Sequence, residues 1–525
     1  MMKNAGLFIL SLCVSPVLAG CSYSGGPIVD ASRNSTGSHH ASSFEQTEFN
    51  TESYDDIIEN NFLSVKENPL STFSIDVDTA SYSNVRRFLN QNQTPPAGAV
   101  RIEEFVNYFD YNYPQPEDET PFSVHNEVAV CPWNKEHRLV RIGLKGREVE
   151  LENRPASNPV FLLDVSGSMN SPDKLPLVKK ALKLLIEQLG ENDRVAIAVY
   201  ASASGLVLPS TTCDHANEIL GALDRLNAGG STNGGQGIQL AYATAIENFI
   251  EGGINRVILC TDGDFNVGIS NRSDLSDLII QKAKSDVFLS ILGFGKGNYK
   301  DAEMEELTNK GNGNYAYIDS LNEAKKVLVE QAAGTLITIA KDVKIQVDFN
   351  PAKVQAYRLI GYENRLLNAE DFHDDTKDAG EIGAGHTVTA MYEIVPWGVD
   401  SPAGFAEPSK YKKPSVSSST NDIVKSDELL TVRLRYKQPE SDESIRFDVP
   451  LNDDNNSFDA ASLDFQFAAS VAEFGLLLRD SKYKGDASFE NVRVLAIQNQ
   501  GDDLHGYRSE FIQLVDKAAK LAGEY

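Results

Sequence analysis

The sequence predicts an α/β protein whose centre is a doubly wound, mostly parallel β-sheet. An N-terminal α+β region and a C-terminal region rich in strands and helices are expected to flank it. Between residues 156 and 340, short and wholly apolar runs alternate with amphipathic segments, as is typical of parallel strands buried on both faces of a sheet. After residue 341, apolar and polar residues alternate one by one, which indicates antiparallel strands with one solvated face.

The N-terminus has the pattern of a secretory signal. Lys3 is followed by an apolar core at residues 7–14 that is too short to span a bilayer. Residues 18–21 read Leu-Ala-Gly-Cys and resemble the lipobox of bacterial lipoproteins, although an ordinary signal peptide that happens to precede a cysteine is the alternative. The resemblance implies a diacylglycerol on Cys21 and a lipid-anchored protein of the cell envelope. Ser22, where an Asp would retain a lipoprotein in the inner membrane, favours the outer membrane.

Shifts in composition divide the chain into successive parts. Residues 21–60 are rich in Ser, Asn, Gly and Thr and lack apolar periodicity, which predicts a flexible tether. Helices are expected at 81–90 and 101–109 in the N-terminal domain, and at 465–478 and 507–522 in the C-terminal domain. The predicted parts are a signal peptide at 1–20, a flexible tether at 21–60, an N-terminal domain at 61–155, an α/β domain at 156–340 and a C-terminal, β-rich domain at 341–525.

The elements of the α/β domain follow one another in a regular order. Strands are predicted where the apolar runs are continuous, at 160–163, 194–200, 256–260, 287–292 and 315–318. Helices are predicted where apolar residues recur at helical spacing, at 175–189, 216–226, 237–250, 275–283, 302–309 and from 322 onward. A ligand crevice is therefore expected at the carboxyl ends of these parallel strands.

The charge excludes several classes of partner. The 525 residues carry a formal net charge of −27, which argues against nucleic acid and against electrostatic adsorption to anionic lipid. Composition is otherwise that of a soluble globular protein, and the acidity is interpreted as an aid to solubility. The glycine-rich loop at 229–235 lacks the Gly-Lys-Ser/Thr ending of a P-loop, so no nucleotide is expected.

The cysteines outside the signal have separate interpretations. Cys260 lies in an apolar strand pattern and is predicted to be an inert core thiol. A disulfide between Cys131 and Cys213 is left open, because sequence alone cannot establish it. Their spacing does not predict a zinc site.

Oxygen-bearing side chains gather in the sequence around the predicted crevice. Asp164, Ser166 and Ser168 directly follow one apolar strand, and Asp262 directly follows another. Thr232 lies in the glycine-rich loop that precedes a helix. Carboxylates and hydroxyls are ligands for hard divalent cations, and softer ligands are absent from this set. The residues therefore predict a site for Mg²⁺, or for Mn²⁺ or Ca²⁺.

The same residues resemble the metal-ion-dependent adhesion site of von Willebrand factor A domains. That family combines Asp-x-Ser-x-Ser, a distant Thr and a later Thr-Asp-Gly, and all these positions are filled here. The resemblance implies that Ser166, Ser168 and Thr232 reach the metal directly, and that Asp164 and Asp262 complete the shell directly or through water. It also implies that an acidic side chain of a protein partner takes the remaining coordination position.

A wider resemblance covers most of the mature chain. Residues 77–88 and 103–109 resemble the N-terminal, von Willebrand factor A-associated domain of a bacterial lipoprotein family. Residues 358–365 and 378–386 resemble its C-terminal domain of unknown function. The resemblance implies architecture more than biology.

Together these observations predict a lipid-anchored module for metal-dependent protein binding, in adhesion or assembly, and not an enzyme. The serines would serve as metal ligands, and no His or Lys near either motif is expected to act as a base. Two alternatives stay open. One is an envelope scaffold in which the metal only adds stability, and the other is a metal-dependent hydrolase.

Overall fold

A computed structural model describes most of the chain, and Phe49–Tyr525 forms one compact unit. Within the described ranges, no helix is both long and apolar enough to cross a membrane. The predicted signal peptide, Cys21 and most of the tether lie outside them. The described residues are 52–75, 78–149, 154–230, 235–263, 272–297, 299–331, 337–377, 379–402 and 426–524.

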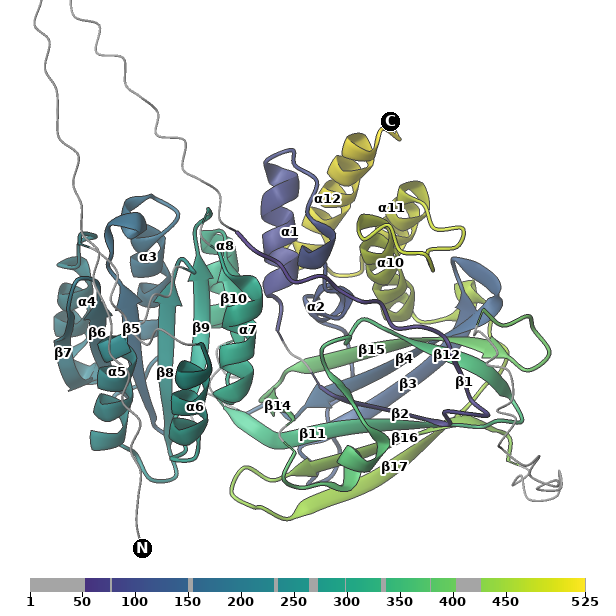
Figure 1. Cartoon of the computed structure of the whole chain (residues 1–525), viewed down its shortest axis with the longest axis horizontal. Helices are drawn as coiled ribbons and strands as arrows, with labels where there is room; N and C mark the ends of the chain where they lie inside the picture. The colour runs from purple at the N-terminus through teal and green to yellow at the C-terminus, as the bar shows by residue number, and fades with distance from the viewer. Residues whose placement is uncertain are drawn as a thin grey trace, which may run out of the picture. The chain divides into compact units, whose positions relative to one another are not determined.

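The α/β part contains the predicted sheet, with strand order β10-β9-β8-β5-β6-β7 (Figure 1). All pairings are parallel except that of β6 with β7, which is antiparallel. Strand β7 was not predicted, because half-exposed Ser and Thr residues interrupt its apolar pattern. The strands are β5 (Ser157–Asp164), β6 (Arg194–Tyr200), β7 (Ser204–Thr212), β8 (Ile254–Thr261), β9 (Phe288–Phe294) and β10 (Tyr315–Ile318).

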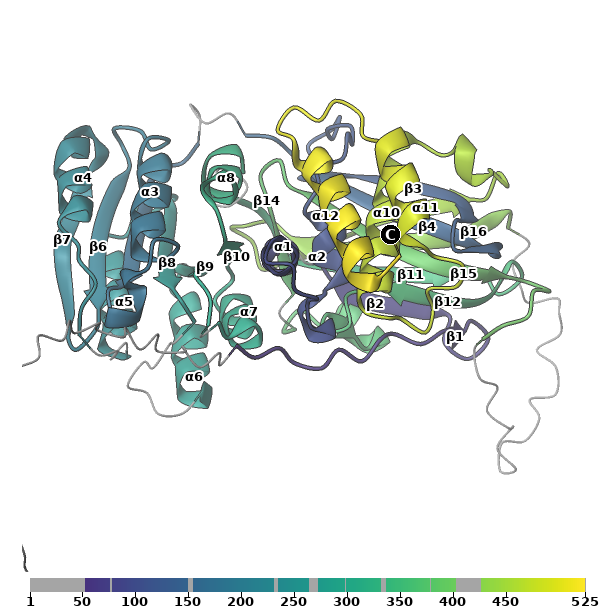
Figure 2. The same ribbon diagram turned by 90° about the horizontal axis from the view of Figure 1, so that it is seen from above.

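Helices cover both faces of this sheet. Figure 2 shows α3, α4 and α8 on one face and α5, α6 and α7 on the other. Each face has its own buried apolar core, so the prediction of a doubly wound, mostly parallel sheet is confirmed. The helices are α3 (Leu175–Ile186), α4 (Ala216–Asp224), α5 (Gly235–Glu247), α6 (Arg272–Ala283), α7 (Asp301–Lys310) and α8 (Leu321–Lys325), which continues into a π-helix at Lys326–Glu330.

Two antiparallel sheets form a second structural part, and each draws strands from both sides of the α/β domain in the sequence. One has the order β1-β12-β15-β4-β3, and the other has the order β13-β2-β11-β16-β17 with β14 beside β11. Their inner faces share one apolar core. The strands are β1 (Leu63–Ser64), β2 (Leu70–Ser74), β3 (Phe122–Cys131), β4 (Asn134–Gly146), β11 (Thr338–Phe349), β12 (Val354–Ile360), β13 (Leu366–Leu367), β14 (Gly380–Gly383), β15 (Thr387–Pro396), β16 (Glu428–Lys437) and β17 (Ser444–Asn452).

A group of helices packs beside these sheets and likewise combines both ends of the chain (Figure 1). Aromatic rings fill much of its core, and Phe109 contacts Phe467 and Phe511 edge to face. The expected helices are confirmed, whereas α11 was not predicted. The helices are α1 (Ala80–Asn90), α2 (Ile102–Asn107), α10 (Leu463–Leu478), α11 (Phe489–Gln498) and α12 (Tyr507–Ala522), with short 3₁₀ turns at Ala97–Ala99, Gly167–Asn170, Cys213–His215, Ala369–His373 and Phe458–Ala460.

A buried ion-pair network joins this helical group to the α/β domain. Arg86 of α1 is 4% exposed, and its guanidinium lies 2.5 Å from Asp319 and 2.7 Å from Glu323, both of the α/β domain. It also lies 3.0 Å from Glu510 of α12 and donates to the hydroxyl of Tyr108. One guanidinium therefore forms ion pairs with carboxylates from two parts of the fold.

The described cysteines are all buried free thiols. Cys131 lies in the core of the helical group and Cys213 in the core of the α/β domain, so the disulfide left open by the sequence is not formed. Cys260 is fully buried in β8, which confirms the predicted core thiol. Burial raises the pKa of the Cys260 thiol and makes it a poor nucleophile.

A buried carboxyl in α10 predicts a pH-dependent stability. Burial raises the pKa of Glu473 to about 7, although Asn491 donates to both of its oxygens. The folded state then holds this proton more tightly than the unfolded state, so stability falls as pH rises from about 4.5 to 7. Glu473→Gln is expected to gain up to about 3 kcal/mol relative to wild type between pH 5 and pH 8. Urea unfolding at both pH values measures this, and parallel profiles for the two proteins would contradict it.

Candidate metal centre

The two predicted aspartates lie at the same edge of the α/β sheet. Asp164 is the last residue of β5, and Asp262 directly follows β8. These strands are parallel neighbours, with Leu163 in register with Cys260, so both carboxylates project from adjacent strand ends. Both residues are fully buried. The sequence-based expectation that they share the crevice edge agrees with this geometry.

The surroundings of Asp164 disfavour its charged form. Its Oδ1 accepts a hydrogen bond of 2.8 Å from the Ser166 amide, whereas its buried Oδ2 has no hydrogen-bond partner of regular geometry among the described residues. Burial raises the pKa of Asp164 to about 7, and the negative charge of Asp262 adds to the effect. A buried carboxylate oxygen in such a position is suited to a cation.

The two serines present their hydroxyls to each other. Ser166 Oγ and Ser168 Oγ lie 3.0 Å apart in the turn that follows β5. Ser166 is buried, Ser168 is exposed, and the Ser166 side chain makes no capping hydrogen bond to the 3₁₀ turn after it. Helix capping therefore does not account for Ser166, and the pair extends from the buried carboxylates toward solvent.

The glycine-rich loop is held against this turn. The amide of Gly229 donates to Val165 O at 2.8 Å, and the amide of Gly167 donates to Gly230 O at 3.0 Å. Gly230 has a φ of +92°, and a Cβ there would lie 2.3 Å from Ser202 Oγ, so the turn needs glycine. Thr232 itself lies outside the described residues. Gly229 and Gly230, the described end of its loop, contact the turn that carries the two serines.

A lysine that was not predicted lies among these groups. Lys174 Nζ is 2.9 Å from Asp262 Oδ2, and both side chains are buried. Its aliphatic stem packs over Gly295, whose φ is +74°, and leaves no room for a Cβ at that position. The sequence-based argument expected no His or Lys near either motif to act as a base, and the Lys174 ammonium is occupied by its ion pair with Asp262. A cue did exist, because Lys174 precedes α3 at the helix N-terminus, where a cation is electrostatically unfavourable.

The donors present suit a hard cation. They are carboxylate and hydroxyl oxygens, and the buried Oδ2 of Asp164 can still coordinate a cation. No group of three His, Cys, Asp or Glu side chains within the described ranges could hold a metal by itself. A metal at this edge would therefore depend on the serine hydroxyls as well as on the carboxylates.

Comparisons with protein families agree with this architecture. Residues 48–141 match the family model described as von Willebrand factor, and residues 159–331 match the von Willebrand factor type A domain. Residues 334–521 match the C-terminal region of the uncharacterized protein YfbK. The three matches follow one another along the chain.

Individual relatives show how far each similarity extends. The chain is 44% identical over 478 residues to the uncharacterized protein YfbK of Escherichia coli, and the alignment covers 89% of this chain and 81% of that protein. It is 28% identical over 180 residues to the inter-alpha-trypsin inhibitor heavy chain 4 of Mus musculus, and this alignment covers 32% of this chain and 19% of that protein. A von Willebrand factor type A structure from Catenulispora acidiphila is 17% identical, covers 75% of this chain and 89% of its own, and has a TM-score of 0.39. The chain belongs to the YfbK family of bacterial von Willebrand factor A domain proteins.

Proposed function

We propose that this protein is a lipid-anchored envelope protein whose α/β domain binds an acidic group of a protein partner through Mg²⁺, or through Mn²⁺ or Ca²⁺. The observation that carries the proposal is the convergence of two buried carboxylates and two serine hydroxyls at one edge of the sheet. The predicted ligands described there are all oxygen donors, and one carboxylate oxygen has no hydrogen-bond partner of regular geometry within the described ranges.

Each residue has a distinct part in this proposal. Ser166 and Ser168 would bind the cation through their hydroxyls, with Thr232 as the third hydroxyl from the glycine-rich loop. Asp164 and Asp262 would balance its charge from the buried side. When bound, the cation supplies a positive centre that attracts an anionic ligand, and the exposed position of Ser168 leaves that centre open to a partner.

A binding role is favoured over catalysis by the state of the neighbouring groups. Lys174 is the cationic group that the sequence-based argument lacked, but its ammonium is held by Asp262. The two serine hydroxyls contact each other, and neither contacts a basic side chain among the described residues. A serine nucleophile without a base is a poor catalyst. Cys21 would tether this binding module to the envelope through its lipid.

Capture of a partner from envelope extracts tests the proposal. Purified mature chain is used as bait in Mg²⁺ and in EDTA, beside Ser168→Ala and the exposed-acid control Asp224→Asn. A protein retained only in Mg²⁺, by wild type and by Asp224→Asn but not by Ser168→Ala, is the expected result. A set of bound proteins that is the same in EDTA would count against metal-dependent binding.

The Lys174 ion pair predicts a second measurable effect. Because its ammonium competes with a cation for Asp262, Lys174→Met is expected to raise Mg²⁺ affinity at least about tenfold. Lys180→Met is the matched control, since it removes an equal charge from an exposed position of the same helix. Calorimetric titration compares the two variants. Equal affinities would show that the Lys174 contact does not oppose the metal.

A further inference from the structure

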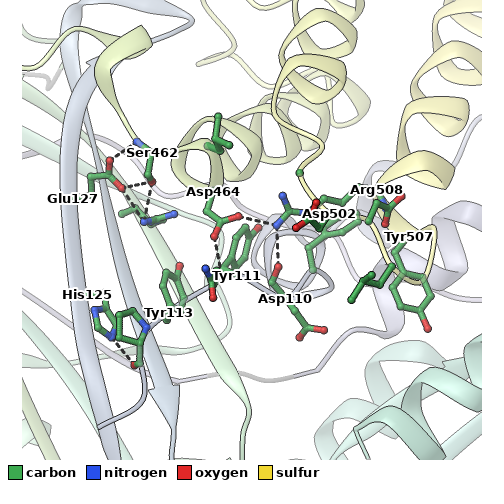
Figure 3. A pocket seen from close by; sticks show the side chains of 18 of the residues that line it. Asp110, Tyr111, Tyr113, His125, Glu127, Ser462, Asp464, Asp502, Tyr507 and Arg508 are labelled. Carbon is green, nitrogen blue, oxygen red and sulfur yellow. Dashed lines mark hydrogen bonds and ion pairs between the residues drawn. The ribbon is translucent and has the colours of Figure 1, made fainter. Parts of the chain in front are cut away.

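A large open cavity lies apart from the metal centre. Its volume is about 1170 Å³, which exceeds the roughly 300–1,000 Å³ of ordinary small-ligand pockets. Residues 109–114, strand β3 and the start of α10 line it together with the loop that leads into α12. In Figure 3, His125 and Glu127 stand on the β3 side, and the other side of the cavity has Asp464 of α10, Arg508 of α12 and Asp502 of the loop before α12. No described residue of the α/β domain lines it.

Strand β3 offers an open sheet edge to this cavity. It is the last strand of its sheet, and among the described strands it pairs with β4 alone. The Val130 amide donates to Asn456 O, away from β4, so by alternation the backbone groups of Val124 and Asn126 also point outward. Neither has a backbone hydrogen bond on that side among the described residues. Both polar atoms of the Asn126 side chain are also buried without a partner in the described part of the chain.

The cavity follows the strand edge rather than one face of the sheet. Residues 124–127 all line it, although successive side chains of a strand point to opposite faces. On one face, the Tyr113 ring stacks on His125 with centroids 5.6 Å apart and packs against Gly143. An occupant that matches this shape is a further strand laid beside β3.

The charge of the residues that line the cavity indicates which side chains such a strand should carry. Arg141 is paired with Glu127 at 2.8 Å, and Arg508 is paired with Asp464 at 2.8 Å. Asp110 and Asp502 are exposed, and neither forms an ion pair within the described ranges. The lining is therefore net acidic, with carboxylates that remain available to a cation.

Two exposed apolar side chains add a second requirement. Leu463 is 57% exposed and Leu504 is 88% exposed, and both line the cavity. Both therefore present apolar surface to an occupant of the cavity. The occupant should thus carry apolar as well as basic side chains.

We propose that this cavity binds an extended, basic segment of a protein partner, which adds a strand to the open edge of β3. Its backbone pairs with Val124 and Asn126, its basic side chains reach Asp110 and Asp502, and its apolar side chains cover Leu463 and Leu504. This site is separate from the metal centre and takes a ligand of opposite charge.

The probe for this site is a fluorescent seven-residue peptide of alternating Val and Lys, measured by anisotropy with the mature chain in EDTA. Saturable binding is expected, and the double variant Asp110→Asn/Asp502→Asn should weaken it about tenfold. The control double variant Asp427→Asn/Asp442→Asn removes two exposed acids elsewhere and should not change it. Because the chain is acidic overall, equal weakening by both pairs would mean diffuse adsorption and overturn the proposal.

A second peptide tests strand addition without altering the protein. A fully N-methylated Val-Lys peptide keeps its charge but has no N–H donors, so its binding should be lost. A Val-Glu peptide should not bind. Equal binding of the methylated peptide, or no binding of the parent peptide, overturns the proposal. Binding should persist in Asp164→Ala, so failure of the metal-centre proposal would leave this result unchanged.

Discussion

Asp164→Ala is expected to abolish Mg²⁺ binding while the α/β domain stays folded. The residue supplies the buried carboxylate at the end of β5, and its Oδ2 has no other hydrogen-bond partner of regular geometry in the described part of the chain. Loss of this charge should weaken Mg²⁺ binding by at least about 100-fold. Even residues that only hydrogen-bond to the ligands of a metal contribute about 10- to 100-fold to its affinity. Calorimetric titration of the soluble mature chain measures the loss.

Asp164→Asn separates loss of the charge from damage to the fold. An amide oxygen can still accept from the Ser166 amide, but the variant carries no carboxylate. Since the pKa of Asp164 is raised to about 7, its ionised form costs the metal-free protein up to about 4 kcal/mol at pH 8. In EDTA, Asp164→Asn should therefore be at least as stable as wild type. Retained Mg²⁺ binding in both variants would contradict the assigned centre.

Arg86→Met is expected to destabilise the protein by about 3–5 kcal/mol, the usual effect of removing one partner from a buried ion pair. The substitution leaves Asp319 and the fully buried Glu323 without their shared cation, and burial already raises the pKa of Glu323. The loss should be greater at pH 8 than at lower pH, because the raised pKa of the Glu323 carboxyl means that its charge needs the guanidinium most when it is ionised. Urea unfolding of the mature chain at pH 8 gives the difference in free energy.

Arg493→Met is the matched control for this experiment. Arg493 pairs with Asp516 at 2.9 Å, but both side chains are more than a third exposed. Exposed pairs contribute about 1 kcal/mol or less. If the two variants unfold at the same urea concentration, the Arg86 network does not stabilise the contact between the helical group and the α/β domain.

The sequence predicted the shared edge of the metal centre because short-range patterns determine it. Apolar runs at β5 and β8 identify buried parallel strands, and the residues after them must project from the same edge. Lys174 was not identified because its contact depends on how its stem packs over Gly295, far along the chain. The position of Thr232 stays a prediction.

The pairing of strands in the two antiparallel sheets could not be predicted from the sequence, for a different reason. Alternation shows that β4 and β15 are strands, but it does not say which strands pair. Their contacts join residues that lie far apart, such as His137 and Glu393, separated by 256 positions. The open edge of β3 follows from this pairing and could not be predicted either.

The two antiparallel sheets, whose strands come from before and after the α/β domain in the sequence, also impose an order on folding. All strands of the α/β sheet lie within Ser157–Ile318, so this sheet can form from one continuous segment of the chain. By contrast, β4 can pair with β15 only after the whole α/β domain has been synthesised, because β15 follows that domain in the sequence. Long-range pairing of this kind slows folding and prolongs the exposure of unpaired strand edges. A chain emerging from its amino end can therefore complete the α/β sheet while β4 still lacks its partner β15. A folding helper that shields β-strand edges would act on residues 122–146 during that interval.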